Sequence, residues 1–149
     1  MNRIFSLETP KASYTNKAAI LWCSDRRFES LRLAFEASIG LMMSDPIIIP
    51  GGVKNLVMPK HPRDAEFIME QIELLRSHGF TRLYAMAHRG CAACHKNMRK
   101  AFYVELLFKA DEILRARFKD LEILPVFADF DGVYVLEEHC VEGRIRLSA

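Results

Sequence analysis

The sequence predicts an α/β protein with a mainly parallel central sheet of about four strands flanked by helices. Two observations support this fold class. Short apolar runs recur along the chain, as in strands that are covered on both faces. Between them lie longer segments in which apolar residues recur every three or four positions, as on the buried face of a helix. Strands that alternate with helices form crossover units, which join parallel neighbours.

Four apolar runs are the predicted strands. They are 17–23 (KAAILWC), 46–50 (PIIIP), 81–88 (TRLYAMAH) and 121–128 (LEILPVFA). Farther along, 129–138 (DFDGVYVLEE) predicts a turn at Asp131–Gly132 followed by a strand, and 143–149 (GRIRLSA) predicts a final extended piece. This tail could form an extra edge strand or an arm on a partner subunit.

Three helices are predicted between these strands from the spacing of apolar residues. The first carries Phe28, Leu31, Phe35 and Ile39, the second carries Phe67, Ile68, Ile72 and Leu75, and the third extends from Met98 to Phe118. The loop 58–64 (MPKHPRD) precedes the second helix, and Asp64 is expected to be its N-cap.

Length and composition predict a single domain over residues 1–149. Half of the residues are hydrophobic and 27% are charged, as in an ordinary globular protein. The formal charge of +2 is evenly spread, which argues against a nucleic-acid partner and favours a small-molecule substrate. No apolar run is long enough for a membrane span or a secretory signal, so we expect a cytoplasmic protein without a membrane partner.

The candidate site lies where two predicted strands end. Cys23 ends the first strand and His88 ends the third, and Cys91 follows three residues later. Ligands collect at the carboxyl ends of parallel strands, so these side chains converge if the first and third strands are neighbours. Two thiolates and one imidazole are donors that zinc prefers, and three protein ligands leave a position for water or substrate. Nearby Arg27 and Arg89 are expected to lower the pKa of the thiols.

Other interpretations of these residues stay open at this point. A cysteine at the end of an apolar strand is commonly a small core residue, and a lone histidine is commonly structural. In the reducing cytoplasm, the pair Cys91 and Cys94 (CAAC) could be a redox couple, or Cys94 could close a four-ligand zinc site. Asp25 could be the fourth ligand or could orient a bound water, depending on its pairing with Arg27.

The motif Cys23-x-Asp25-x-Arg27 followed by His88-x-x-Cys91 resembles the signature of the β-class carbonic anhydrases. The resemblance implies that the two cysteines and the histidine hold Zn²⁺, and that Asp25 and Arg27 are a catalytic dyad. It implies a lyase (carbonate dehydratase) that hydrates carbon dioxide to bicarbonate by a zinc-bound hydroxide. It also implies a homodimer or higher homo-oligomer with the active site near the subunit interface.

The resemblance covers about residues 17–135 and has departures near the expected substrate position. The family's asparagines are missing from the turn 49–55 (IPGGVKN), although Gly52 can stand for the family glycine. Ala92 replaces the glycine that usually follows the second zinc cysteine. We expect backbone N–H groups of Gly51 and Gly52 to contact a substrate oxygen. Two alternatives stay open: hydrolysis of carbonyl sulfide or carbon disulfide at the same zinc, and a non-catalytic zinc-stabilised protein in which Asp25 permanently caps the metal.

Overall fold

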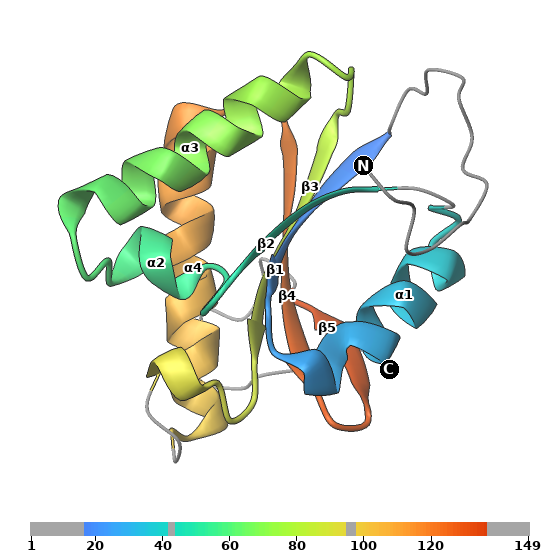
Figure 1. Ribbon diagram of the computed structural model, residues 1–149, viewed down its shortest axis with the longest axis vertical. Helices are drawn as coiled ribbons and strands as arrows, with labels where there is room; N and C mark the ends of the chain where they lie inside the picture. The colour runs from blue at the N-terminus through green and yellow to red at the C-terminus, as the bar shows by residue number, and fades with distance from the viewer. Residues whose placement is uncertain (1–16, 42–43, 95–97, 137–149) are drawn as a thin grey trace, which may run out of the picture.

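A five-stranded sheet forms the centre of the computed structural model, which describes residues 17–41, 44–94 and 98–136 (Figure 1). The strands are β1 (Ala18–Cys23), β2 (Asp45–Ile49), β3 (Arg82–His88), β4 (Glu122–Asp129) and β5 (Gly132–Val135). Their order is β2-β1-β3-β4-β5, with parallel pairing from β2 to β4 and antiparallel pairing of β4 with β5. The predicted fold class is therefore confirmed, including the extra edge strand.

The edge strand β5 forms a hairpin with β4. Its turn is Phe130–Asp131, one residue earlier than predicted, because Gly132 already pairs with Asp129 in the ladder. The predicted extended piece at 143–149 lies outside the described residues.

The helices lie on both faces of the sheet. They are α1 (Glu29–Ser38), α2 (Lys54–Val57), α3 (Pro62–Arg76) and α4 (Lys100–Arg117), with short 3₁₀ turns η1 (Arg26–Phe28) and η2 (Ala92–Cys94). In Figure 1, α2, α3 and α4 lie on one side of the sheet and α1 on the other. The elements that the sequence did not predict, α2, η1 and η2, are too short for a helical period to show. Among the described residues, no helix has the length and apolarity needed to cross a membrane.

The start of α3 corrects one prediction. The N-cap is His61 and the helix begins at Pro62, so Asp64 is the third helical residue and the predicted cap is wrong. The Asp64 carboxylate accepts hydrogen bonds from the backbone N–H groups of His61 (2.9 Å) and Lys60 (3.1 Å). Pro62 is tolerated in the first turn because an N–H group there has no partner within the helix.

The central strand β1 is buried along its whole length. Ala19, Ile20, Leu21 and Trp22 have no solvent exposure, because β2 and β3 flank the strand and helices cover both faces. After β1 the chain forms β2 on one side, then returns to form β3 on the other. The loops that follow β1 and β3 therefore begin side by side, which is the position where α/β sheets bind ligands.

Candidate metal centre

Two sulfur atoms from distant parts of the chain lie together at this switch point. Cys23 ends β1 and Cys91 lies in the turn after β3, and their Sγ atoms are 4.0 Å apart. The three donor atoms of Cys23, His88 and Cys91 all lie within 4.8 Å of one another, and all three residues are buried. Zn–S bonds of about 2.3 Å in a tetrahedral site place two sulfurs about 3.8 Å apart. The spacing of the sulfurs therefore fits one zinc ion.

The His88 ring is oriented as metal-ligating imidazoles are. Its Nδ1 lies 3.0 Å from the Arg89 carbonyl oxygen, so a protonated Nδ1 donates to that oxygen and leaves the lone pair on Nε2. Nε2 is buried and has no hydrogen-bond partner among the described residues. The Phe28 ring packs against the imidazole with 4.4 Å between ring centres. A buried acceptor without a hydrogen-bond partner, facing two sulfurs, fits a metal ligand.

The loop after β2 holds the first sulfur in place. The Gly51 N–H donates to Cys23 Sγ (3.2 Å), and the Gly52 N–H donates to the Ile49 carbonyl (3.1 Å). Both glycines have positive φ, and a Cβ on Gly52 would lie 2.6 Å from the Met86 carbonyl oxygen. Both N–H groups therefore bind protein atoms, and their expected contact with a substrate oxygen stays a prediction.

Without a metal, the clustered thiols keep their protons. The contact with Cys91 and then burial raise the pKa of Cys23 to about 12. The contact with Cys23 lowers the pKa of Cys91, but the contact with Cys94 and burial outweigh it, so that this pKa is raised. A cation that binds here must displace these protons.

The expected lowering of the thiol pKa values is wrong, because the pKa values of both Cys23 and Cys91 are raised. Each guanidinium pairs with a carboxylate instead: Arg27 with Asp25, and Arg89 Nε with Asp129 Oδ1 at 2.7 Å. Arg27 still attracts the charged form of both thiols, but burial and sulfur–sulfur contact outweigh this attraction.

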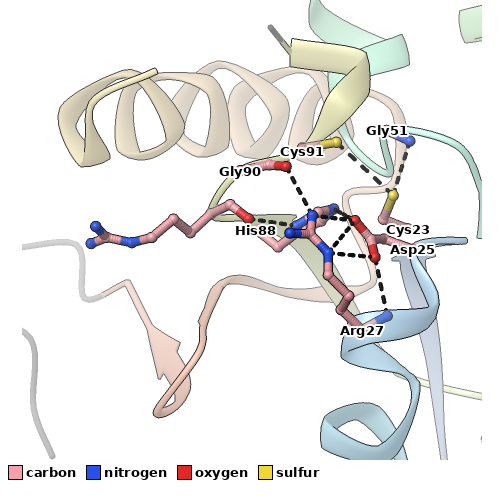
Figure 2. A network of polar contacts seen from close by, with 8 residues as sticks. Cys23, Asp25, Arg27, Gly51, His88, Gly90 and Cys91 are labelled. Atoms are coloured by element: carbon pink, nitrogen blue, oxygen red, sulfur yellow. Dashed lines mark hydrogen bonds and ion pairs between the residues drawn. The ribbon is translucent and has the colours of Figure 1, made fainter. Parts of the chain in front are cut away.

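Asp25 is held beside the three donors by Arg27, as Figure 2 shows. Its carboxylate caps η1 by accepting from the Arg27 backbone N–H (3.1 Å) and also binds the guanidinium through Nε (3.0 Å) and Nη2 (2.6 Å). The same Nη2 donates to the Gly90 carbonyl (3.0 Å). Asp25 Oδ2 is 4.0 Å from His88 Nε2, so the carboxylate borders the candidate metal position. Hydrogen bonds from Arg27 lower the pKa of Asp25 to about 2.

Cys94 lies beside the donor group without belonging to it. It is buried at the end of η2, and its contact with Cys91 lowers its pKa. Cys23, Cys91 and Cys94 are all free cysteines. The donor group of Cys23, His88 and Cys91 does not include Cys94, which argues against a closed four-ligand site. The fourth cysteine, Cys140, lies outside the described residues.

The chain resembles known proteins in structure only. It matches no protein-family model and no curated protein sequence. It superposes on β-carbonic anhydrase isoform I from the protozoan Trichomonas vaginalis with a TM-score of 0.57, at 14% identity over 87% of each chain. The fold is that of the β-carbonic anhydrases. A second structure, the β-carbonic anhydrase CcaA, covers 84% of this chain and 81% of its own at 9% identity, with a TM-score of 0.52. At such identities the likeness establishes the fold alone.

Sequence reasoning missed two residues beside the site, Gly90 and Phe130. Gly90 supplies a carbonyl to Arg27, and its place between His88 and Cys91 could have marked it. Phe130 lies near the same guanidinium, with 5.8 Å between Arg27 Cζ and the ring centre. Nothing local in the sequence indicates the contact of Phe130, because it depends on how the β4–β5 hairpin lies against η1.

Proposed function

We propose that this protein is a zinc enzyme of the β-carbonic anhydrase type that hydrates carbon dioxide to bicarbonate. The observation that carries the proposal is the convergence of Cys23, His88 and Cys91, with the partnerless Nε2 of His88 facing the two sulfurs. The fold of structures that are themselves β-carbonic anhydrases supports it. In the proposal these three residues hold Zn²⁺ within one domain.

The reaction joins water and carbon dioxide and releases a proton. When bound, zinc lowers the pKa of a coordinated water, so that hydroxide is available near neutral pH. Asp25 faces this space, where its carboxylate can accept a hydrogen bond from the attacking oxygen and direct the remaining lone pair at carbon. Arg27 has a positioning role, because it occupies the Asp25 oxygens that would otherwise be free to approach the metal. The proton leaves to solvent, and bicarbonate dissociates.

Stopped-flow carbon dioxide hydration with zinc-loaded protein tests the proposal. Metal content is measured on the same sample, and the matched pair of variants is Asp25→Asn and Asp120→Asn. Asp120 also accepts from an arginine, Arg76, but belongs to a surface ion pair. We expect one zinc per chain, hydration by the wild type and by Asp120→Asn, and a loss of about 100-fold or more in kcat for Asp25→Asn.

The outcomes separate this function from its rivals. Full zinc occupancy without hydration from about pH 7 to about pH 9 rejects the carbonic anhydrase proposal. Carbonyl sulfide supplied to the same sample, with sulfide as the readout, then identifies the sulfur substrate. Inactivity toward both gases with zinc retained indicates a structural metal. If the protein binds no zinc, then carbon dioxide hydration, carbonyl sulfide hydrolysis and a structural zinc site are all rejected.

A homodimer or larger homo-oligomer forms part of the proposal. The expectation comes from the resemblance of the site motifs to the β-carbonic anhydrases. Sedimentation equilibrium of the zinc-loaded protein gives the mass of the assembly, and a monomer at micromolar concentration would contradict this part alone.

A further inference from the structure

An aromatic residue in the β4–β5 turn lies against the arginine of the candidate site. Phe130 is 65% exposed, so burial alone does not account for its position. Its ring stacks on Phe28, with 5.5 Å between ring centres and 28° between ring planes. Phe28 in turn packs on the His88 imidazole. Phe130 is therefore the solvent-facing end of a row of three rings that begins at a candidate metal ligand.

The guanidinium of Arg27 contacts two of these rings and also binds groups of the loops after β1 and β3. Its Cζ lies 5.8 Å from the ring centres of both Phe28 and Phe130, within the range of cation–π attraction. Its polar edge binds the Asp25 carboxylate and the Gly90 carbonyl. The arginine side chain is 53% exposed, and an exposed ion pair by itself holds two flexible side chains weakly. The rings supply contacts that the ion pair lacks.

The position of Phe130 is itself fixed to the strand end that carries the histidine. The Phe130 backbone N–H donates to Asp129 Oδ1 (2.9 Å), and the same carboxylate binds Arg89. Arg89 follows His88 directly, and its backbone N–H donates to the Ala128 carbonyl (3.0 Å). The hairpin that presents Phe130 is therefore joined to the end of β3 by both backbone and side-chain contacts.

We propose that Phe130 is a positioning residue that keeps the Arg27 guanidinium against Asp25, so that the carboxylate stays beside the metal position and does not occupy it. The inference rests on the proposed function only in taking the three donors as a zinc site. Loss of the Phe130 ring frees one side of the guanidinium. Asp25 Oδ2, which is 4.0 Å from His88 Nε2, then has a short path to the metal position.

The matched variants are Phe130→Leu, Phe130→Tyr and Phe67→Leu. Tyrosine keeps the ring face, whereas leucine keeps apolar volume without it. Phe67 on α3 is 51% exposed and lines a surface with Arg63 and Glu70, so Phe67→Leu makes the same chemical change at similar exposure away from the site. Thermal unfolding of all three variants confirms that each is folded.

The first readout follows Arg27 directly by ¹H–¹⁵N spectroscopy of its Nε–H group, assigned by loss of the peak in Arg27→Lys. We expect Phe130→Leu to remove the part of the ring-current shift that Phe130 contributes and to speed solvent exchange of this proton about fivefold or more, as a contact of the guanidinium is lost while that with Phe28 remains. Phe130→Tyr and Phe67→Leu should leave the peak in place. An unmoved peak in Phe130→Leu, or an equal shift in Phe67→Leu, overturns the inference.

The second readout is the visible spectrum of the cobalt-substituted protein, which reports the ligands of the metal. Phe130→Leu should shift the spectrum toward carboxylate coordination, and the double variant Phe130→Leu/Asp25→Asn should abolish that shift. A Phe130→Leu spectrum identical to wild type contradicts the positioning role. Neither readout needs hydration activity, so a failure of the inference is distinguishable from a failure of the proposed function.

Discussion

Asp25 Oδ2 lies 4.0 Å from His88 Nε2, although Asp25 follows β1, His88 ends β3 and the carboxylate is bound to Arg27. The nitrogen has no hydrogen-bond partner among the described residues, so its lone pair and the carboxylate border the same space. Two states of the site follow from this pair. With Arg27 in place the carboxylate faces the space, and without it the carboxylate can enter.

Near pH 8 the thiols of Cys23 and Cys91 should release about two protons per zinc ion, in addition to the proton lost by a coordinated water, because both thiols have raised pKa values in the metal-free protein. The sign follows from these shifts: below the raised pKa values each thiol must lose a proton to bind, so apparent affinity increases with pH. Calorimetry in buffers of different ionisation enthalpy measures the release. Cys91→Ser should release about one proton fewer, whereas a wild-type release near zero would mean that the sulfurs are not ligands.

Serine substitutions should separate the ligand sulfurs from their neighbour. Cys23→Ser should weaken zinc binding by more than about 100-fold, which exceeds the usual effect of losing a group that only hydrogen-bonds to a metal ligand. Cys94→Ser should change zinc binding by less than about tenfold. Cys23 and Cys94 are a matched pair, because they are 5% and 3% exposed. Replacing either buried thiol by a hydroxyl should therefore disturb the packing to a similar extent. Competition with a chromophoric chelator gives both constants. Equal losses would place Cys94 among the ligands and restore the closed site.

Much of the fold could be predicted because its strands are buried on both faces. The apolar run that ends at Cys23 matches β1 within one residue, and the run that ends at His88 matches β3 equally closely. Each candidate ligand lies at or just after a strand end, so a local motif sufficed to place it. The neighbouring positions of β1 and β3 then brought the motifs together, as the prediction required.

The features of the site that the sequence did not predict depend on contacts between residues far apart in the chain. The raised pKa of Cys23 arises from a sulfur 68 positions away, which no local pattern contains. Arg89 was expected to act on the thiols, but the β4 strand places Asp129 beside it. Phe130 carries no periodic signal because it lies in a turn, and its contact with Arg27 exists only once the hairpin has packed against η1.

Arg27→Gln should raise the pKa of Asp25 in the metal-free protein from about 2 toward the ordinary 3.8. A lowered pKa means that the pair stabilises the folded state above the ordinary value and that this stabilisation is lost as pH falls through about 2. At about pH 3, roughly a tenth of the Asp25 carboxyl should be protonated in wild type and most of it in the variant. Carboxyl ¹³C spectra measure these fractions. Arg76→Gln, which removes two surface ion pairs, should leave the Asp25 titration unchanged.

Gly52→Ala should destabilise the protein far more than Gly79→Ala, although both glycines have positive φ (+53° and +85°). A Cβ at Gly79 meets nothing within 4 Å, so only the backbone conformation is penalised, by about 1–2 kcal/mol. At Gly52 the Cβ would lie 2.6 Å from the Met86 carbonyl oxygen. Met86 and His88 both belong to β3, so relieving this clash would move the strand that carries the candidate ligand. We expect a total loss above about 3 kcal/mol in urea unfolding, together with weaker zinc binding. Equal losses for the two variants would show that the loop moves freely away from β3, and that the close contact at Gly52 does not hold the metal ligands in place.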